Sequence, residues 1–339
     1  MSLRQGIPLA EGSTGDSVDD VKFRLAEIGL DTSLDPASTY GPATRAAVEA
    51  FQRRRGLPIT GVVDTATWDT LVEAGYLLGR RVLLRQVPLL RGDDVADLQQ
   101  RLCALGFDTN RVDGLFGDLT AHAVEQFQQN MGLKPDGVAG LSTIEALLRL
   151  GPRTENARSV TEVRANESLR HHLGGPLYRS IAIADLGGMA AAVAQLTREL
   201  HQSAEVSVIE VTGDESNQAT QANAAEVDLY LGLHSSGRAS GSRTMFYKGY
   251  SYTSAAGEFL ASRISQTLPV PFADQINEVV GMALPLLRET LMTAVILEVG
   301  PAELVVEHGP GLCQAVAKAI LETARRDVDN ELTSSTLHP

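Results

Sequence analysis

A repeat within the first 150 residues constrains the fold of this chain more than any other feature. The segment Gly15-Asp16-Ser17-Val18 aligns with Gly92-Asp93-Asp94-Val95, and the agreement continues along both copies. Further matched pairs are Leu25 and Leu102, Gly29 and Gly106, Tyr40 and Phe116, Gly41 and Gly117, Phe51 and Phe127, Gly61 and Gly137, and Leu71 and Leu147. A repeat of this kind indicates two copies of one small structural unit. We therefore predict one module at residues 12–77 and a second at residues 90–150.

Each copy has the pattern of three short helices. In the second copy, apolar residues recur at helical spacing after Asp93 and Asp94, and we expect one of these two aspartates to cap the first helix. Gly106 marks the end of that helix, and a glycine-containing turn at 113–117 leads into the next one. A second turn at 134–137 precedes the third helix. Three such helices can enclose one small core, so both modules are predicted to be all-α.

These motifs resemble those of the peptidoglycan-binding three-helix domain. The second copy carries the complete pattern of G-D-x-V, D-G-x-F-G, A-V-x-x-F-Q and D-G-x-x-G, whereas the first has D-P-A-S-T-Y-G at its first turn. The resemblance implies a shallow ligand surface at that turn and the following helix. The residues implied to bind the ligand are Asp113, Gly114, Phe116, Gly117 and Phe127. The same residue types also suit a small core, so murein binding and a purely structural or protein-binding role both stay open.

Domains usually contain roughly 100–200 residues, so the chain after residue 150 is long enough for another domain. Residues 151–177 are polar and bounded by glycine and proline, which predicts a linker. Within 178–326, apolar strands alternate with helical stretches, and this order favours an α/β domain with a mainly parallel sheet. Residues 327–339 are predicted to form a flexible tail. The expected protein is multidomain, with two all-α three-helix modules followed by the α/β domain.

The C-terminal half resembles the zinc-dependent N-acetylmuramoyl-L-alanine amidase family. Ala222-Asn223 and the later D-L-Y-L-G-L-H-S-S segment are similar to the family's "A-N…a-D-l-f-i-S-i-H-a-N" motif. A second segment, A-V-I-L-E-V-G, is similar to its "a-v-L-v-E-l-G-F" strand. With the modules included, the resemblance extends from about Val18 to Glu322. It implies that His234 stands at a zinc-ligand position and Glu298 at the position of the general base.

The opening motif departs from the family pattern. Family members hold zinc with a histidine in "i-D-P-G-H-G-G", a glutamate shortly after it, and the histidine that ends the central strand. Here the opening segment reads I-A-D-L-G-G-M at 183–189, and the loop that carries the glutamate is missing. A hydrolytic zinc site needs about three protein ligands and an open position. We therefore expect the zinc to be lost, no cofactor to be bound, His234 to be the only retained ligand and Glu298 to be vestigial.

Other histidines offer no recognised spacing for zinc ligands. His171 and His172 precede the first strand, His201 lies near a helix end, and His308 is expected in a loop after the last strand. A rearranged metal site stays the alternative.

Charge and targeting signals narrow the partners and the location. With 29 basic and 42 acidic residues, the net charge is −13, which disfavours a nucleic-acid partner. No run of about 18 apolar residues is present, so no membrane span is predicted. The N-terminal segment lacks the apolar core of a secretory signal. We expect a cytoplasmic protein, or an extracytoplasmic one if the native N-terminus is longer.

The tail contains two candidate phosphorylation sites. Thr333 and Thr336 follow an acidic stretch, and phosphate on either would add roughly two negative charges and could create an arginine-binding site. The alternative is an unmodified polar end.

Together these features predict an inactive amidase-like protein that acts in peptidoglycan metabolism by binding. The expected partners are peptidoglycan fragments, lipid-linked precursors or cell-wall synthesis proteins, and one such role is regulation of precursor synthesis. Two alternatives stay open: an active zinc amidase that cleaves the muramoyl–L-alanine amide, and a non-catalytic murein-binding anchor.

Overall fold

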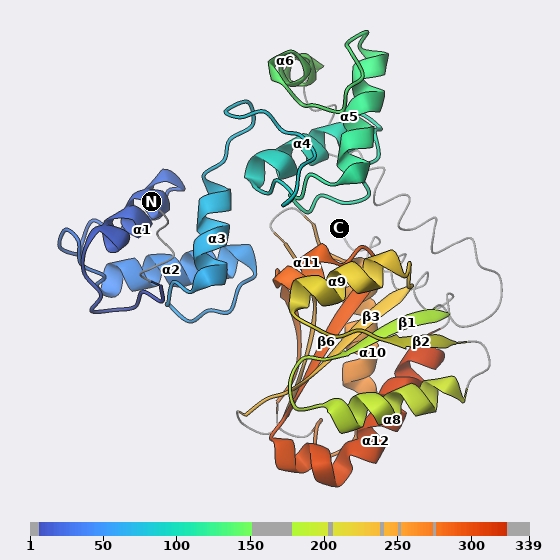
Figure 1. Ribbon diagram of the computed structural model, residues 1–339. Helices are drawn as coiled ribbons and strands as arrows, with labels where there is room; N and C mark the ends of the chain where they lie inside the picture. The colour runs from blue at the N-terminus through green and yellow to red at the C-terminus, as the bar shows by residue number, and fades with distance from the viewer. Residues whose placement is uncertain are drawn as a thin grey trace, which may run out of the picture. The chain divides into compact units, whose positions relative to one another are not determined.

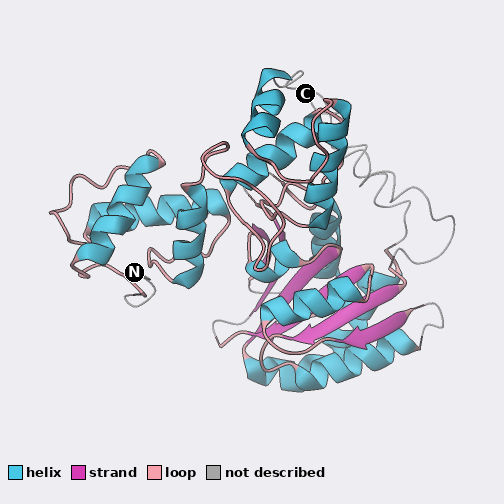
Figure 2. Cartoon of the chain, turned by 45° about the horizontal axis from the view of Figure 1, so that its top comes forward, coloured by secondary structure: helices cyan, strands magenta, loops and turns pink. Residues whose placement is uncertain are grey.

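The computed structural model describes residues 7–150, 178–202, 206–237, 241–249, 252–273 and 276–323. The chain divides into two compact units, the first with both helical repeats and the second with the C-terminal α/β domain (Figures 1 and 2). The predicted linker at 151–177 and tail at 327–339 lie outside the described residues, as do Thr333 and Thr336. The domain boundaries stay predictions.

Each repeat consists of three helices, as the sequence pattern predicted. The first repeat contains α1 (Asp16–Glu27), α2 (Pro42–Arg55) and α3 (Thr65–Ala74). The second contains α4 (Asp93–Ala104), α5 (Asp118–Asn130) and α6 (Leu141–Leu150). Because each helix is amphipathic, its apolar side faces a core of its own repeat, and equivalent aromatic residues fill the two cores. Phe51 in the first core corresponds to Phe127 in the second.

The expected cap of α4 by Asp93 or Asp94 was wrong. Gly92 is the N-cap residue and provides no side-chain cap, while both aspartates lie in the first turn of the helix. The Asp93 carboxylate pairs with Arg55 at 2.7 Å, and the Asp94 carboxylate pairs with Arg81 at 2.7 Å. Gly92 has a φ of 154°, and a Cβ there would lie 2.6 Å from Oδ1 of Asp94, so both the backbone conformation and the ion-paired Asp94 favour glycine at this position.

A buried glutamine fixes the turn before the last helix of each repeat. The Gln52 side-chain amide donates to the Val62 carbonyl at 2.9 Å, and its oxygen accepts from the backbone N–H of Gly61 at 2.9 Å. Gln128 makes the same pair of contacts with Val138 and Gly137, both at 3.0 Å. These bonds satisfy backbone groups that the turn would otherwise bury without partners.

The second unit is built on a six-stranded sheet with the strand order β2-β1-β3-β6-β4-β5. The strands are β1 (Ser180–Asp185), β2 (Ser207–Glu210), β3 (Leu229–Ser235), β4 (Gly241–Tyr247), β5 (Asn277–Met282) and β6 (Thr293–Gly300). Neighbouring strands are parallel, except that β4 and β6 are antiparallel. The mainly parallel sheet confirms the predicted fold class.

Helices cover both faces of this sheet. They are α8 (Ala190–His201), α9 (Glu215–Ala224), α10 (Ala255–Thr267), α11 (Pro285–Glu289) and α12 (Ala302–Leu321). Helices α8, α10 and α12 pack on one face and form the main core with Leu231, Leu297 and their neighbours. Figure 1 shows α9 and α11 on the other side, which we call the α9 face. His308 lies within α12, so the loop expected for it was wrong.

Strand alternation decides which residues reach the α9 face. The Tyr230 hydroxyl on β3 donates to Gln218 of α9 at 2.7 Å, so Tyr230 points to that face. Gly232 and His234 follow at intervals of two residues and therefore share it. Glu298 is the register partner of His234 on β6 and joins the same face.

Candidate functional site

The structure brings His234 and Glu298 together. They are direct neighbours on the parallel strands β3 and β6, near the carboxyl ends where functional residues of such sheets gather. Nδ1 of His234 lies 3.6 Å from Oε2 of Glu298. Their side chains are 40% and 25% exposed, so both are accessible from solvent.

The loop after β1 lies against this pair. The Asp185 carboxylate accepts from the backbone N–H groups of Gly187 at 2.8 Å and Met189 at 2.9 Å, which folds the loop back on itself. Ser235 on β3 donates its backbone N–H to the Gly187 carbonyl at 2.8 Å. A Cβ atom at Gly187 would therefore stand 3.3 Å from Cδ2 of His234. Gly187, the loop residue next to the imidazole, has no side chain that could serve as a metal ligand.

Leu186 fills the space beside His234 on the α9 face. A Cβ atom at Gly232 would meet Cδ1 of Leu186 at 2.6 Å, so the leucine lies directly over the glycine. Cγ1 of Ile296 on β6 lies 3.4 Å from the same Cβ position, so both side chains border Gly232. An apolar side chain thus occupies the wall next to the imidazole.

These residues do not fit a three-ligand zinc site. The pair supplies one imidazole and one carboxylate, and the adjoining loop supplies leucine and glycine. Among the described parts of the chain, no group of three or more His, Cys, Asp or Glu side chains could hold a metal ion. His201 ends α8 and His308 lies in α12, both on the opposite face of the sheet from His234. His171 and His172 lie outside the described residues.

Two further charged residues continue from Glu298 across the sheet. Arg243 on β4 is the antiparallel register partner of Glu298, and Glu278 on β5 is the partner of Arg243. Nε of Arg243 lies 3.3 Å from Oε2 of Glu278. Neither residue stands out in the sequence, because only the antiparallel register of β4 reveals that they adjoin Glu298.

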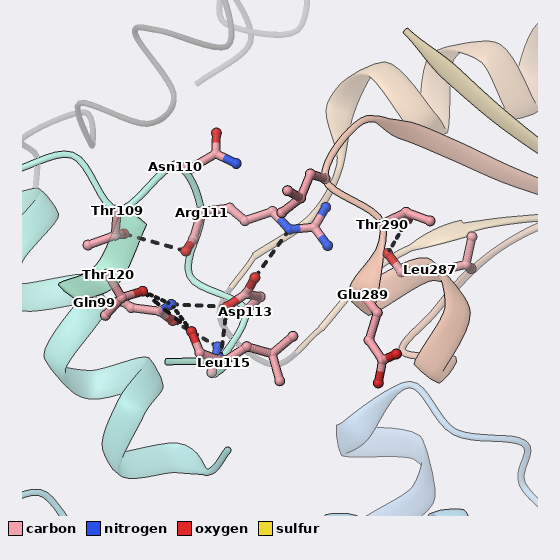
Figure 3. Close-up of polar contacts among 12 residues, drawn as sticks. Gln99, Thr109, Asn110, Arg111, Asp113, Leu115, Thr120, Leu287, Glu289 and Thr290 are labelled. Atoms are coloured by element: carbon pink, nitrogen blue, oxygen red, sulfur yellow. Dashed lines mark hydrogen bonds and ion pairs between the residues drawn. The ribbon is translucent and has the colours of Figure 1, made fainter. Parts of the chain in front are cut away.

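In the second repeat, Gln99 organises the turn to which the resemblance assigns ligand binding (Figure 3). Its side-chain amide donates at 3.0 Å to Asp113, to the Leu115 carbonyl and to Thr120. Its oxygen accepts from the backbone N–H of Gly114 at 2.8 Å. The guanidinium of Arg111 adds an ion pair with Asp113 at 3.5 Å. Asp113 and Gly114 are thus held in one fixed turn.

Two of the five predicted ligand residues of this repeat are core residues. Phe116 is 0% exposed and Phe127 is 1% exposed, and Phe127 makes an edge contact with Phe107 at a ring distance of 5.6 Å. A ligand cannot reach these rings without opening the core. Gly114 is buried as well, whereas Asp113 and Gly117 are partly exposed, and ligand contact at these three positions stays a prediction.

Comparisons with known proteins agree with this organisation. A family described as "Putative peptidoglycan binding domain" matches residues 14–71 and 91–147. The N-acetylmuramoyl-L-alanine amidase CwlM of Mycobacterium tuberculosis is 31% identical over 369 residues, covering 95% of this chain and 89% of its own length. The amidase CwlL of Bacillus licheniformis is 30% identical over 163 residues, covering 42% of this chain and 45% of its own length.

Among solved structures, the catalytic domain of the amidase CwlV from Bacillus (Paenibacillus) polymyxa var. colistinus is similar in structure. The match covers 44% of this chain and 99% of that domain, with 17% sequence identity and a TM-score of 0.37.

Two peptidoglycan-binding-type modules followed by an amidase-like α/β domain define a class of multidomain proteins associated with peptidoglycan. Within that class, the chain belongs to the N-acetylmuramoyl-L-alanine amidase family. None of the described helices has both the length and the apolar content needed to cross a bilayer.

Proposed function

We propose that this protein acts in peptidoglycan metabolism by binding, and that it does not hydrolyse the amide between muramic acid and L-alanine. Its ligands are peptidoglycan fragments or lipid-linked precursors, and its α/β domain binds no zinc. The observation that carries the proposal is the pairing of His234 with a loop of Leu186, Gly187 and Gly188. Glycine has no side chain and that of leucine is a hydrocarbon, so neither supplies a side-chain ligand, whereas a hydrolytic zinc needs about three protein ligands.

Zinc would polarise the scissile carbonyl and generate the attacking hydroxide. Without it, the remaining groups are the His234 imidazole and the Glu298 side chain. They can hold a polar ligand by hydrogen bonds and charge, but they lack the Lewis acid of the family's reaction.

Metal analysis combined with a murein assay tests this proposal. We expect the purified full-length chain to contain far less than one zinc per molecule after incubation with excess zinc and desalting. We also expect no release of stem peptides from murein. One zinc per chain together with peptide release would establish the hydrolase alternative and overturn the proposal.

The match of the peptidoglycan-binding family to both repeats favours a second candidate, a non-catalytic murein anchor. It predicts that the full chain sediments with insoluble murein and that Asp113→Ala weakens this sedimentation. Asp97→Ala is the matched control, since Asp97 lies on the surface of the same repeat and pairs with Arg101 at 2.6 Å. Equal sedimentation of both variants would contradict a ligand role for the turn of the second repeat.

We further propose that the chain binds proteins of cell-wall synthesis in the cytoplasm and regulates precursor synthesis there. The two cysteines, Cys103 and Cys313, are buried and are not joined in a disulfide, which suits a reducing compartment. Fractionation and affinity capture from the native cell test this part. Recovery outside the cytoplasm, or partners confined to unrelated pathways, would contradict it.

A further inference from the structure

Four side chains form a row across the α9 face of the sheet, which we call the charged row. They are His234, Glu298, Arg243 and Glu278, and each is the register partner of the next. Side chains directly opposite each other on neighbouring strands stand about 4.5–5.5 Å apart at Cβ. A carboxylate and a guanidinium therefore lie side by side at the centre of the row.

This central pair has unused hydrogen-bonding capacity. Arg243 uses Nε for Glu278, and its two Nη groups donate to no other described residue. Glu298 approaches His234 at 3.6 Å, beyond hydrogen-bond range, and accepts no hydrogen bond from any described residue. A partly buried carboxylate without a donor is costly, so it recruits water or a ligand.

The surroundings of the pair strengthen its interaction with a ligand. Ile296 and Met245 lie two residues from Glu298 and Arg243 on the same strands and are register partners of each other. They are 4% and 6% exposed. Leu186 adds an apolar wall on the side of His234. Next to such a low-dielectric floor, a charge on Glu298 or Arg243 attracts an opposite charge more strongly than it would in water.

We propose that Glu298 and Arg243 bind a zwitterionic α-amino acid group. The ammonium of the ligand donates to the Glu298 carboxylate, and its carboxylate accepts from the Nη groups of Arg243. A guanidinium edge fits a carboxylate with two parallel hydrogen bonds. The inference rests on the proposed function, because it uses Glu298 as a binding group.

The unused hydrogen-bonding groups favour a zwitterion over a simple ion. Arg243 forms its ion pair with Glu278 through Nε, which leaves the two Nη groups of Arg243 as donors and the Glu298 carboxylate as an acceptor. A simple anion would satisfy Arg243 but leave Glu298 without a donor, and a simple cation would do the reverse. A ligand whose ammonium and carboxylate are attached to the same carbon pairs with both groups at once. Its source is either a free amino acid or an amino acid group at the end of a peptide side chain.

Titration of the full-length chain with four small probes tests the inference. Alanine represents the free amino acid, and γ-glutamylalanine carries the same group on a peptide. N-acetylalanine lacks the ammonium, and alaninamide lacks the carboxylate. We expect saturable binding of γ-glutamylalanine, alanine or both, at least tenfold tighter than of either blocked derivative. Binding of both zwitterions identifies a free amino acid as sufficient, and binding of γ-glutamylalanine alone identifies the peptide-borne group.

Substitutions within the charged row test whether the ligand binds there. Arg243→Gln and Glu298→Gln should each weaken the bound zwitterion at least tenfold, and Arg243→Gln should also abolish its preference over alaninamide. Arg198→Gln, on the surface of α8 across the sheet, is the matched control and should bind as the unchanged chain does. Thermal unfolding of each variant reports whether it is folded.

The inference is overturned if neither zwitterion binds saturably to the folded protein, or if both row variants bind like Arg198→Gln. Either result leaves the zinc and murein assays untouched, so a failed amino acid site is distinct from a failed binding function. One zinc per chain would instead refute the proposed function directly.

Discussion

The two helical repeats share a fold but build their first turns with different chemistry. In the second repeat, neutral Gln99 bridges the turn through four hydrogen bonds. The aligned residue in the first repeat is Lys22, whose ammonium donates to the carbonyls of Asp35 at 3.1 Å and Pro36 at 2.8 Å. The Asp35 carboxylate then accepts from the backbone N–H of Thr44 at 2.6 Å.

The second turn shows the opposite behaviour, since Gln52 and Gln128 make equivalent bonds in both copies. One turn is therefore common to both copies, whereas the other differs between them while the fold persists. The variable turn is the one to which the family resemblance assigns ligand binding. The two repeats can therefore differ in ligand while they keep the same core.

The largest expected effect comes from the shared glutamines. Gln52→Ala removes an amide that contacts Thr60, Val62 and Thr67 and leaves buried turn groups without partners. We expect a loss of about 4 kcal/mol from the free energy of unfolding of the first repeat. Urea unfolding followed by fluorescence of Trp68, the single tryptophan, measures it.

Gln128→Ala should destabilise the second repeat by a similar amount, measured by hydrogen exchange of the α5 and α6 amides. Gln126→Ala, on the exposed side of α5, is the control and should change stability by less than about 0.5 kcal/mol. A large loss in one repeat and none in the other would break the claim that this turn is common to the fold.

An intermediate effect separates the variable turns. Gln99→Ala should cost the second repeat about 3 kcal/mol, because three acceptors of the turn lose their donor and the Gly114 N–H loses its acceptor. Lys22→Ala should cost the first repeat about 1 kcal/mol, because its bonds lie at the surface. Hydrogen exchange for the second repeat and Trp68 fluorescence for the first measure the two losses.

Gln100→Ala is the control for Gln99, since its side chain is exposed on the same helix. Equal losses for Gln99→Ala and Lys22→Ala would show that the two turns are energetically equivalent despite their different chemistry.

The smallest expected effect concerns pH. Burial opposes the charge of Asp35, but hydrogen bonds from Thr44, Ala43 and Gly41 outweigh it and hold the pKa of this carboxyl below its ordinary value. A lowered folded-state pKa stabilises the repeat above the unfolded value of about 3.9 and loses that contribution as pH falls through the folded value.

Asp35→Asn should therefore make the stability of the first repeat less dependent on pH below about 4. Trp68 fluorescence during acid titration measures the slope, and Asp16→Asn, at an exposed position of α1, is the control. An unchanged slope in Asp35→Asn would remove Asp35 from the explanation of the turn.

Some features were accessible from local sequence patterns. The repeat, the three helices of each module and the alternation of strands and helices follow from apolar spacing and turn residues, and the structure confirms them. The cap of α4 was wrong because an aspartate can either cap a helix or form ion pairs from its first turn. Arg55 and Arg81, distant in sequence, decided between these roles for Asp93 and Asp94.

The candidate site was accessible only in part. The resemblance drew attention to His234 and Glu298, and the motif at 183–189 lacked a histidine. Arg243 and Glu278 carried no motif, because their importance depends on the antiparallel pairing of β4 with β6. For Phe116 and Phe127 the sequence left packing and ligand contact open, and burial decided for packing.

The sequence by itself determined the elements and the chemistry available to them, including the glycines where the family has a metal ligand. The tertiary structure decided which of those groups meet: the imidazole beside the carboxylate, the leucine over Gly232, and the guanidinium beyond Glu298. The physical reason is that strand register is set by pairing between distant segments. A shift of one residue would turn every side chain of a strand to the other face of the sheet.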